Sequence, residues 1–152
     1  FYPKGDFFIG TLVISFFALS DLFDGAMARI SHKGASAWGG FLDSTIDRIT
    51  DSAILVGLTL YLVDADDPLT AVVIGSLVFG SLVPYIRAKA ESMQISCSGG
   101  IAERTERLII SLTAIGLEGL GVPFALAIGI WLLLILAVVT VIQRILIVKA
   151  AL

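Results

Sequence analysis

Two stretches of this sequence decide its fold: Asp21-Leu-Phe-Asp24-Gly25-Ala-Met-Ala28-Arg29 and, nine residues later, Gly39-Gly-Phe-Leu-Asp43-Ser-Thr-Ile-Asp47. The segments that carry them are otherwise strongly apolar, and a charged carboxylate near hydrocarbon is costly and usually retained for function. Spacings of three and four residues put each pair of aspartates on one helical face, with Cβ atoms roughly 5–6 Å apart. Four like charges brought together repel one another unless cations neutralise them. The pattern therefore predicts a site for two divalent ions at a membrane surface.

The composition indicates a membrane protein. The chain has 152 residues, of which 57% are hydrophobic and only 15% are charged, whereas a soluble domain is usually about 25% charged. We expect an all-α, polytopic transmembrane helical bundle that forms a single domain over residues 1–152. The lone cysteine, Cys97, excludes a disulfide within the chain. Because the first residues are typical of a loop and no initiator methionine is present, we expect an N-terminal helix region to be missing.

Five segments are long and apolar enough to cross a bilayer, which takes about 20 residues in a helix. They cover residues 7–30, 38–63, 69–93, 103 to about 120, and 124 to about 149. The first two segments carry the four aspartates on either side of a short polar turn. Five spans place the start of the chain on the outer side, so one further helix, making six, would return the terminus to the cytoplasm.

The basic residues near the ends of these segments fall almost entirely on one side. The exception is Lys4, which lies on the side of the acidic loop 64–68. An excess of Lys and Arg marks cytoplasmic loops. We therefore expect an integral protein of the cytoplasmic (cell) membrane with all four aspartates toward the cytoplasm. The residues on the basic side are Arg29, Lys33, Arg48, Arg87, Lys89, Arg104, Arg107, Arg144 and Lys149.

The aspartate pattern resembles the signature of the CDP-alcohol phosphotransferase family, Asp-x2-Asp-Gly-x2-Ala-Arg, eight or nine residues, Gly-x3-Asp-x3-Asp, with no departure. The resemblance implies a six-helix integral membrane enzyme of phospholipid biosynthesis, usually a homodimer. Such transferases move a phosphatidyl group from a CDP-linked lipid such as CDP-diacylglycerol to an alcohol and release CMP.

The chemistry of magnesium agrees with this resemblance. Mg²⁺ prefers a few carboxylates together with substrate phosphates, and two ions about 3.5–4 Å apart can clamp the attacking and leaving oxygens. We expect Asp21, Asp24 and Asp43 to be ligands of two Mg²⁺ ions, with Mn²⁺ as the other candidate metal. The resemblance implies that Asp47 is both a ligand and the base for the acceptor hydroxyl.

The first stretch also predicts a nucleotide site. Gly25 and Ala28 lack bulk, so the CDP group can approach the helix there, and Arg29 could contact the diphosphate or pair with an acid. The expected nucleotide and CDP-lipid residues are Asp21, Asp24, Gly25, Ala28, Arg29 and Gly39. The alternative is a structural network in which the aspartates pair with Arg29 and Arg48. For Asp51, three residues after Arg48, we expect a salt bridge to be the main role.

The acceptor is indicated by later segments, Tyr85-Ile-Arg87-Ala-Lys89-Ala-Glu91, Gly99-Gly100-Ile-Ala-Glu103-Arg104-Thr-Glu106-Arg107 and Val141-Ile-Gln143-Arg144. They resemble the actinobacterial phosphatidylinositol phosphate synthases. The implied acceptor is myo-inositol phosphate, held by Lys89, Arg107 and Arg144, with Arg104 as a further candidate. Alternatively, these cations only follow the positive-inside rule and reach lipid headgroups. Arg144 fits that alternative least, because it lies inside the apolar end of the last span.

Two rival functions remain open. A phosphatidylglycerophosphate synthase would use glycerol 3-phosphate, which also carries a phosphate. A divalent-cation transporter would also place carboxylates within spans, although clearance at Gly25 and Ala28, and acids at one membrane face, argue against transport. No nucleic acid partner is expected.

Overall fold

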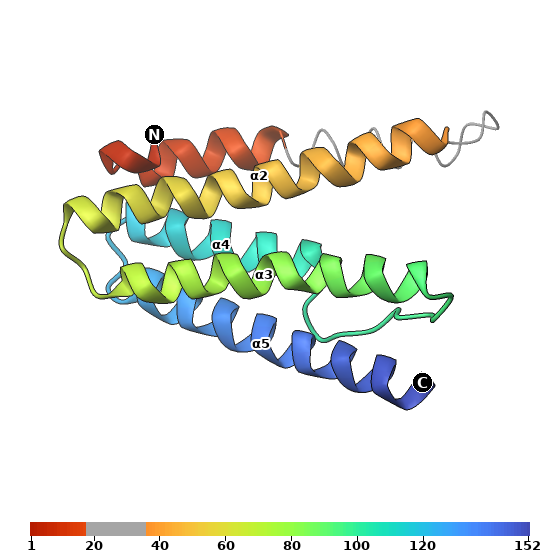
Figure 1. The fold of residues 1–152 in the computed structure, drawn as a ribbon. Coiled ribbons are helices and arrows are strands. Elements are labelled where there is room, and N and C mark those ends of the chain that lie inside the picture. The colour runs from red at the N-terminus through yellow and green to blue at the C-terminus, as the bar shows by residue number, and fades with distance from the viewer. Residues whose placement is uncertain (18–35) are drawn as a thin grey trace.

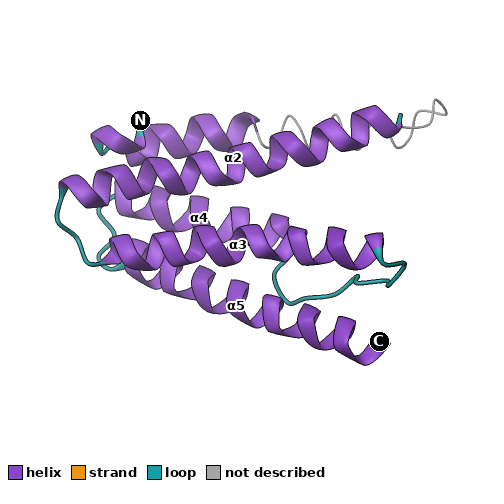
Figure 2. Ribbon diagram, in the orientation of Figure 1, coloured by secondary structure: helices purple, strands orange, loops and turns teal. Residues whose placement is uncertain are grey.

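The computed structural model describes residues 1–17 and 36–152, and this part of the chain is helical and contains no strand (Figure 2). A short 3₁₀ helix, η1 (Tyr2–Lys4), precedes a helical segment described over Phe7–Phe17. The long helices are α2 (Ala37–Asp64), α3 (Leu69–Ser92), α4 (Arg104–Gly119) and α5 (Ala125–Ala151). The predicted all-α class is confirmed. The first aspartate stretch, with Asp21, Asp24, Gly25, Ala28 and Arg29, lies outside the described residues.

The helices run side by side in alternating directions (Figure 1). α3 packs against both α2 and α5, α4 packs against α5, and η1 packs against α2. The start of α2, the end of α3, the start of α4 and the end of α5 consequently lie at one end of the bundle (Figure 1). These are the helix ends that carry the basic residues, so the predicted segregation of positive charge is confirmed for the described part of the chain.

Local sequence signals explain where the helices begin and bend. Ser36 caps α2 by accepting a hydrogen bond on its hydroxyl from the Gly39 amide, at 3.0 Å. A carboxylate oxygen of Asp67 accepts from the Leu69 amide at 2.8 Å and so stabilises the start of α3. Pro84 lies inside α3, where it has no N–H to donate and so interrupts the helical hydrogen bonding.

The buried core joins all four long helices. It is built from large apolar side chains on α2, α3, α4 and α5, including Leu58, Leu62, Val73, Ile115 and Ile130. α5 approaches α4 closely at Gly129, where even a single added Cβ would overlap the side chain of Ala114.

Two of the described helices, α3 and α5, are long and apolar enough to cross a membrane. The exposed surface of α5 carries large apolar side chains such as Ile128, Trp131 and Ile135, which suits contact with lipid. α2 is longer than either, but its first half carries acidic and basic residues, and α4 has only 16 residues. The structure therefore supports an integral membrane helical bundle, and part of the first expected span, 7–30, lies outside the described residues.

Candidate active site

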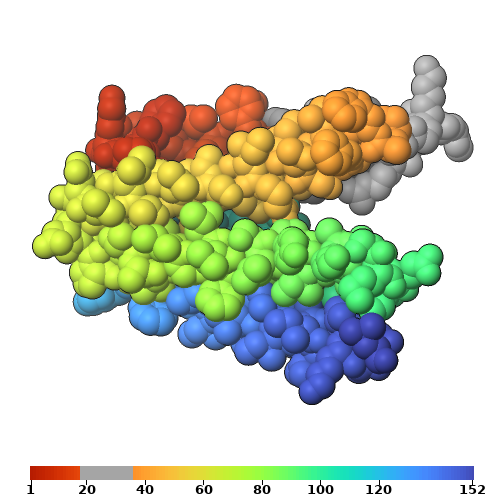
Figure 3. Space-filling model, viewed as in Figure 1, coloured from red at the N-terminus to blue at the C-terminus, as the bar shows by residue number. Residues whose placement is uncertain are grey.

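A cleft of about 760 Å³ opens at the basic end of the bundle. It is bounded by the first half of α2, the Pro84 region of α3, the start of α4 and the last part of α5. In the space-filling view the surface is hollowed between α2 and α3 (Figure 3). Its charged lining residues are Asp47, Arg48, Asp51, Arg87, Glu91, Glu103, Arg104, Arg107 and Arg144.

Asp47 lies at the wall of this cleft. Asp43, Asp47 and Asp51 follow one another at intervals of four residues, so they share one face of α2. The side chain of Asp47 is 14% exposed, and its Oδ1 lies 2.8 Å from Nη2 of Arg104 on α4. This oxygen is buried and accepts no hydrogen bond from the residues that the structure describes. Asp47 therefore has a cationic partner that comes from a different helix.

Asp51 is the most heavily paired acid of the cleft. It accepts a hydrogen bond from Nε of Arg104 at 3.3 Å and forms ion pairs with Nη2 of Arg48 at 3.5 Å and Nη2 of Arg107 at 3.9 Å. The expected salt bridge to Arg48 is confirmed, and two arginines of α4 are added to it. Among the described residues, Arg48 pairs with Asp51 and not with Asp43 or Asp47.

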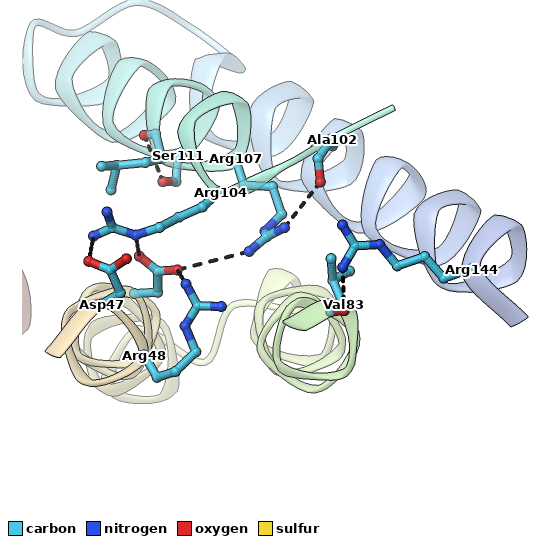
Figure 4. Close-up of polar contacts among 10 residues, drawn as sticks. Asp47, Arg48, Val83, Ala102, Arg104, Arg107, Ser111 and Arg144 are labelled. Carbon is cyan, nitrogen blue, oxygen red and sulfur yellow. Dashed lines mark hydrogen bonds and ion pairs between the residues drawn. The ribbon is translucent and has the colours of Figure 1, made fainter. Parts of the chain in front are cut away.

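Arg107 and Arg144 are the two buried arginines of the cleft. Arg107 donates from Nη1 to the carbonyl of Ala102 at 3.1 Å. Arg144 donates from Nε to the carbonyl of Gly99 at 2.8 Å. It also donates from Nη1 to the carbonyl of Val83 at 2.6 Å (Figure 4). Within the described part of the chain Arg144 has no carboxylate partner, so its charge remains available to an anion in the cleft.

The connection between α3 and α4 holds Arg144 in this position. The amide of Ala102 donates to Oγ1 of Thr140 and that of Ile101 donates to Oε1 of Gln143, both at 3.2 Å. Gly100 has a φ of 133° and packs directly on Thr140, a conformation that favours glycine. Three successive loop residues are thus fixed on α5 beside Arg144.

Three expected site residues do not line the cleft. Gly39 lies exposed in the first turn of α2, Asp43 is exposed one turn before Asp47, and Lys89 is exposed on α3. Arg87, two residues before Lys89, lines the cleft instead and pairs with Glu91 at 2.9 Å. Residues two apart point to different sides of a helix, so only one of this pair lines the cleft wall, and the phosphate-binding role expected for Lys89 stays a prediction.

The described residues fit part of a divalent-metal site. They contain no cluster of three or more side chains that could hold an ion, and two of the four expected ligands, Asp21 and Asp24, lie outside them. Asp43 and Asp47 supply carboxylates on one face of α2, and the buried Asp47 Oδ1 lacks a hydrogen bond. A carboxylate oxygen accepts only, so this atom suits a cation.

Comparison with known proteins agrees with the family resemblance of the aspartate pattern. A family model described as CDP-alcohol phosphatidyltransferase matches residues 1–151. The phosphatidylinositol phosphate synthase of Streptomyces avermitilis is 44% identical over 98% of this chain and 64% of its own length. That of Mycobacterium tuberculosis H37Rv is 40% identical over 94% of this chain and 68% of its own length. The chain thus spans roughly two thirds of the curated relatives it matches.

Solved structures of the Mycobacterium tuberculosis phosphatidylinositol phosphate synthase have the same fold. The one with CDP-DAG bound has a TM-score of 0.89 at 40% identity, covering 97% of this chain and 76% of that chain. The one in complex with manganese and citrate has a TM-score of 0.90 at 40% identity, covering 97% of this chain and 73% of that chain.

Proposed function

Because this chain belongs to the CDP-alcohol phosphatidyltransferase family, we propose that it transfers the phosphatidyl group of CDP-diacylglycerol to myo-inositol phosphate. The products are phosphatidylinositol phosphate and CMP. The observation that carries the proposal is a single cleft in which an acid of the signature, Asp47, lies with two buried arginines, Arg107 and Arg144. The names of the relatives and the CDP-DAG bound to one of them support the same reaction.

Four carboxylates would hold the metal, with Asp21, Asp24, Asp43 and Asp47 as ligands of two Mg²⁺ or Mn²⁺ ions. When bound, the ions would neutralise the diphosphate of the CDP-lipid and stabilise the leaving CMP. Phosphoryl transfer depends mainly on positioning and charge neutralisation, which suits a set of convergent carboxylates. The small residues Gly25, Ala28 and Gly39 would admit the nucleotide, and Arg29 would contact its diphosphate.

The acceptor would bind in the cleft through its phosphate. Arg107 and Arg144 are held by backbone carbonyls, so their planar guanidinium groups are fixed in orientation before the phosphate arrives. Arg104 and Lys89 complete the proposed acceptor set. A carboxylate oxygen of Asp47 would accept the proton of the attacking hydroxyl, a role that requires hydrogen-bond contact with that hydroxyl.

We further propose that the protein works in the cytoplasmic membrane as a homodimer, with the cleft facing the cytoplasm. The gathering of basic residues at the cleft end of the bundle supports this orientation. Glycerol 3-phosphate is the second candidate acceptor, because the cleft cations described here would recognise a phosphate and not an inositol ring.

The test is an assay of CMP release from CDP-diacylglycerol with myo-inositol phosphate, glycerol 3-phosphate, free inositol or serine, with and without EDTA. We expect turnover with myo-inositol phosphate, little with unphosphorylated acceptors, and none in EDTA. Asp43→Asn should abolish CMP release in a folded protein, whereas the control Asp64→Asn, at the opposite end of α2, should be active. Preference for serine or free inositol, or full turnover in Asp43→Asn, would refute the proposal.

A further inference from the structure

We propose that Asp51, an acid outside the four-aspartate signature, is a positioning residue that restrains Arg104 so that Asp47 can bind a divalent ion. The inference rests on the proposed function, because it takes Asp47 as a metal ligand. It goes further in giving a role to a carboxylate that the signature does not include.

The first observation is that one guanidinium group is shared between two carboxylates. Arg104 directs Nη2 to Asp47 Oδ1 at 2.8 Å and Nε to Asp51 Oδ1 at 3.3 Å. The guanidinium is planar and carries several donors, so the two carboxylates share it, each facing a different nitrogen. All three side chains are only partly exposed, at 32%, 14% and 26% for Arg104, Asp47 and Asp51, and partly buried pairs are screened less by salt than surface pairs.

The second observation is the state of the oxygen that Arg104 faces. Asp47 Oδ1 is buried and accepts no hydrogen bond from the described residues. Within this part of the chain, it contacts Arg104 through an ion pair. A divalent ion at this oxygen has to displace the Arg104 Nη2 group or share the oxygen with it. Any acid that competes with Asp47 for Arg104 therefore favours binding of the metal.

Asp51 is the acid that competes with Asp47 for Arg104. Asp51 gives Arg104 a second carboxylate to bind. It also pairs with Arg48 and Arg107, so three arginine side chains contact this one acid. If the charge of Asp51 is removed, Arg104 retains only its pair with Asp47 among the contacts described here. The arginine then competes with the metal for Asp47.

The experiment measures binding of Mn²⁺ to the purified protein in detergent by electron paramagnetic resonance, without substrate. We expect Asp51→Asn to weaken Mn²⁺ binding about tenfold, the effect usual for the outer partners of metal ligands. The double variant Asp51→Asn with Arg104→Gln should bind Mn²⁺ nearly as tightly as the wild type. The matched control, Asp51→Asn with Arg48→Gln, removes the same charge from another partner of Asp51. It should remain weak, because among the described residues Arg48 forms its ion pair with Asp51 and not with Asp47.

The outcomes separate this inference from the proposed function. If Asp47→Asn weakens Mn²⁺ binding but Asp51→Asn does not, the role of Asp51 is refuted and the metal assignment stands. Equal restoration by both double variants would indicate a net-charge effect and would also refute it. Mn²⁺ binding that Asp47→Asn leaves unchanged would overturn both. Arg104→Gln alone tests the same competition without touching Asp51: binding at least as tight as wild type supports the inference, and weaker binding overturns it.

Discussion

Arg144 shows how a charged residue is accommodated in the most apolar helix of the chain. Its side chain is 3% exposed, and two of its donor groups bind carbonyls of the α3–α4 connection and of α3 itself. A buried charge is costly unless it is hydrogen-bonded, and these two carbonyls meet part of that need. An anionic substrate in the cleft would meet the rest.

Arg144→Gln should therefore act mainly on the acceptor. Because a hydrogen bond to a charged group contributes about 1.5–3 kcal/mol, we expect the apparent KM for myo-inositol phosphate to rise about tenfold or more, with little change in that for the CDP-lipid. Steady-state CMP release with each substrate varied in turn measures this split. Lys149→Gln, which removes a charge from an exposed position near the end of α5, is the control and should leave both values near wild type. Equal increases for the two substrates would contradict a phosphate-binding role.

For individual residues, the sequence predicted ion pairs within one helix and missed those between helices. The Arg48–Asp51 salt bridge follows from a spacing of three in one helix. The pairing of Asp47 with Arg104 joins α2 to α4, and a single sequence carries no signal for which of several cleft arginines meets which acid. The sequence also does not specify which of Arg87 and Lys89 lines the cleft, because the rotation of α3 about its axis depends on tertiary packing.

At the scale of helices, the sequence located α2, α3, α4 and α5 to within two residues at each end. Pro68, the glycines around Gly121 and the charged loops mark these ends well. The connection between α3 and α4 was expected only as a loop. Its attachment to Thr140, Gln143 and Arg144 depends on the packing of α3 against α5, which composition and periodicity do not specify.

The close approach of α4 and α5 gives a stability prediction. Gly129→Ala would place a methyl group against Ala114, and overpacking of a well-packed core usually costs about 1–3 kcal/mol. We expect a lower unfolding temperature in detergent. The same substitution at Gly40, where an added Cβ meets no atom within 4 Å, should be neutral or stabilising because alanine favours a helix more than glycine does. An unchanged unfolding temperature for Gly129→Ala would show that the two helices are less tightly packed than described.

At the scale of the whole molecule, the position of the cleft follows from where charged residues lie along the apolar helices. The charged residues that line the cleft come from α2, α3, α4 and α5 and converge at one end of the bundle, and the exposed flanks are apolar. This distribution suits a membrane enzyme that meets a lipid-linked substrate and a water-soluble one at the same surface. Membership of the CDP-alcohol phosphatidyltransferase family agrees with this arrangement of a charged end and apolar flanks.

The most direct test of this account is the number of divalent ions bound per chain in the presence of CDP-diacylglycerol, measured as Mn²⁺ by mass spectrometry after gel filtration. The account predicts two ions for the wild-type protein, as in sites whose ions lie about 3.5–4 Å apart, and fewer for Asp43→Asn with the fold intact. A wild-type protein that binds no Mn²⁺, or an Asp43→Asn variant that binds as many ions as the wild type, would contradict it.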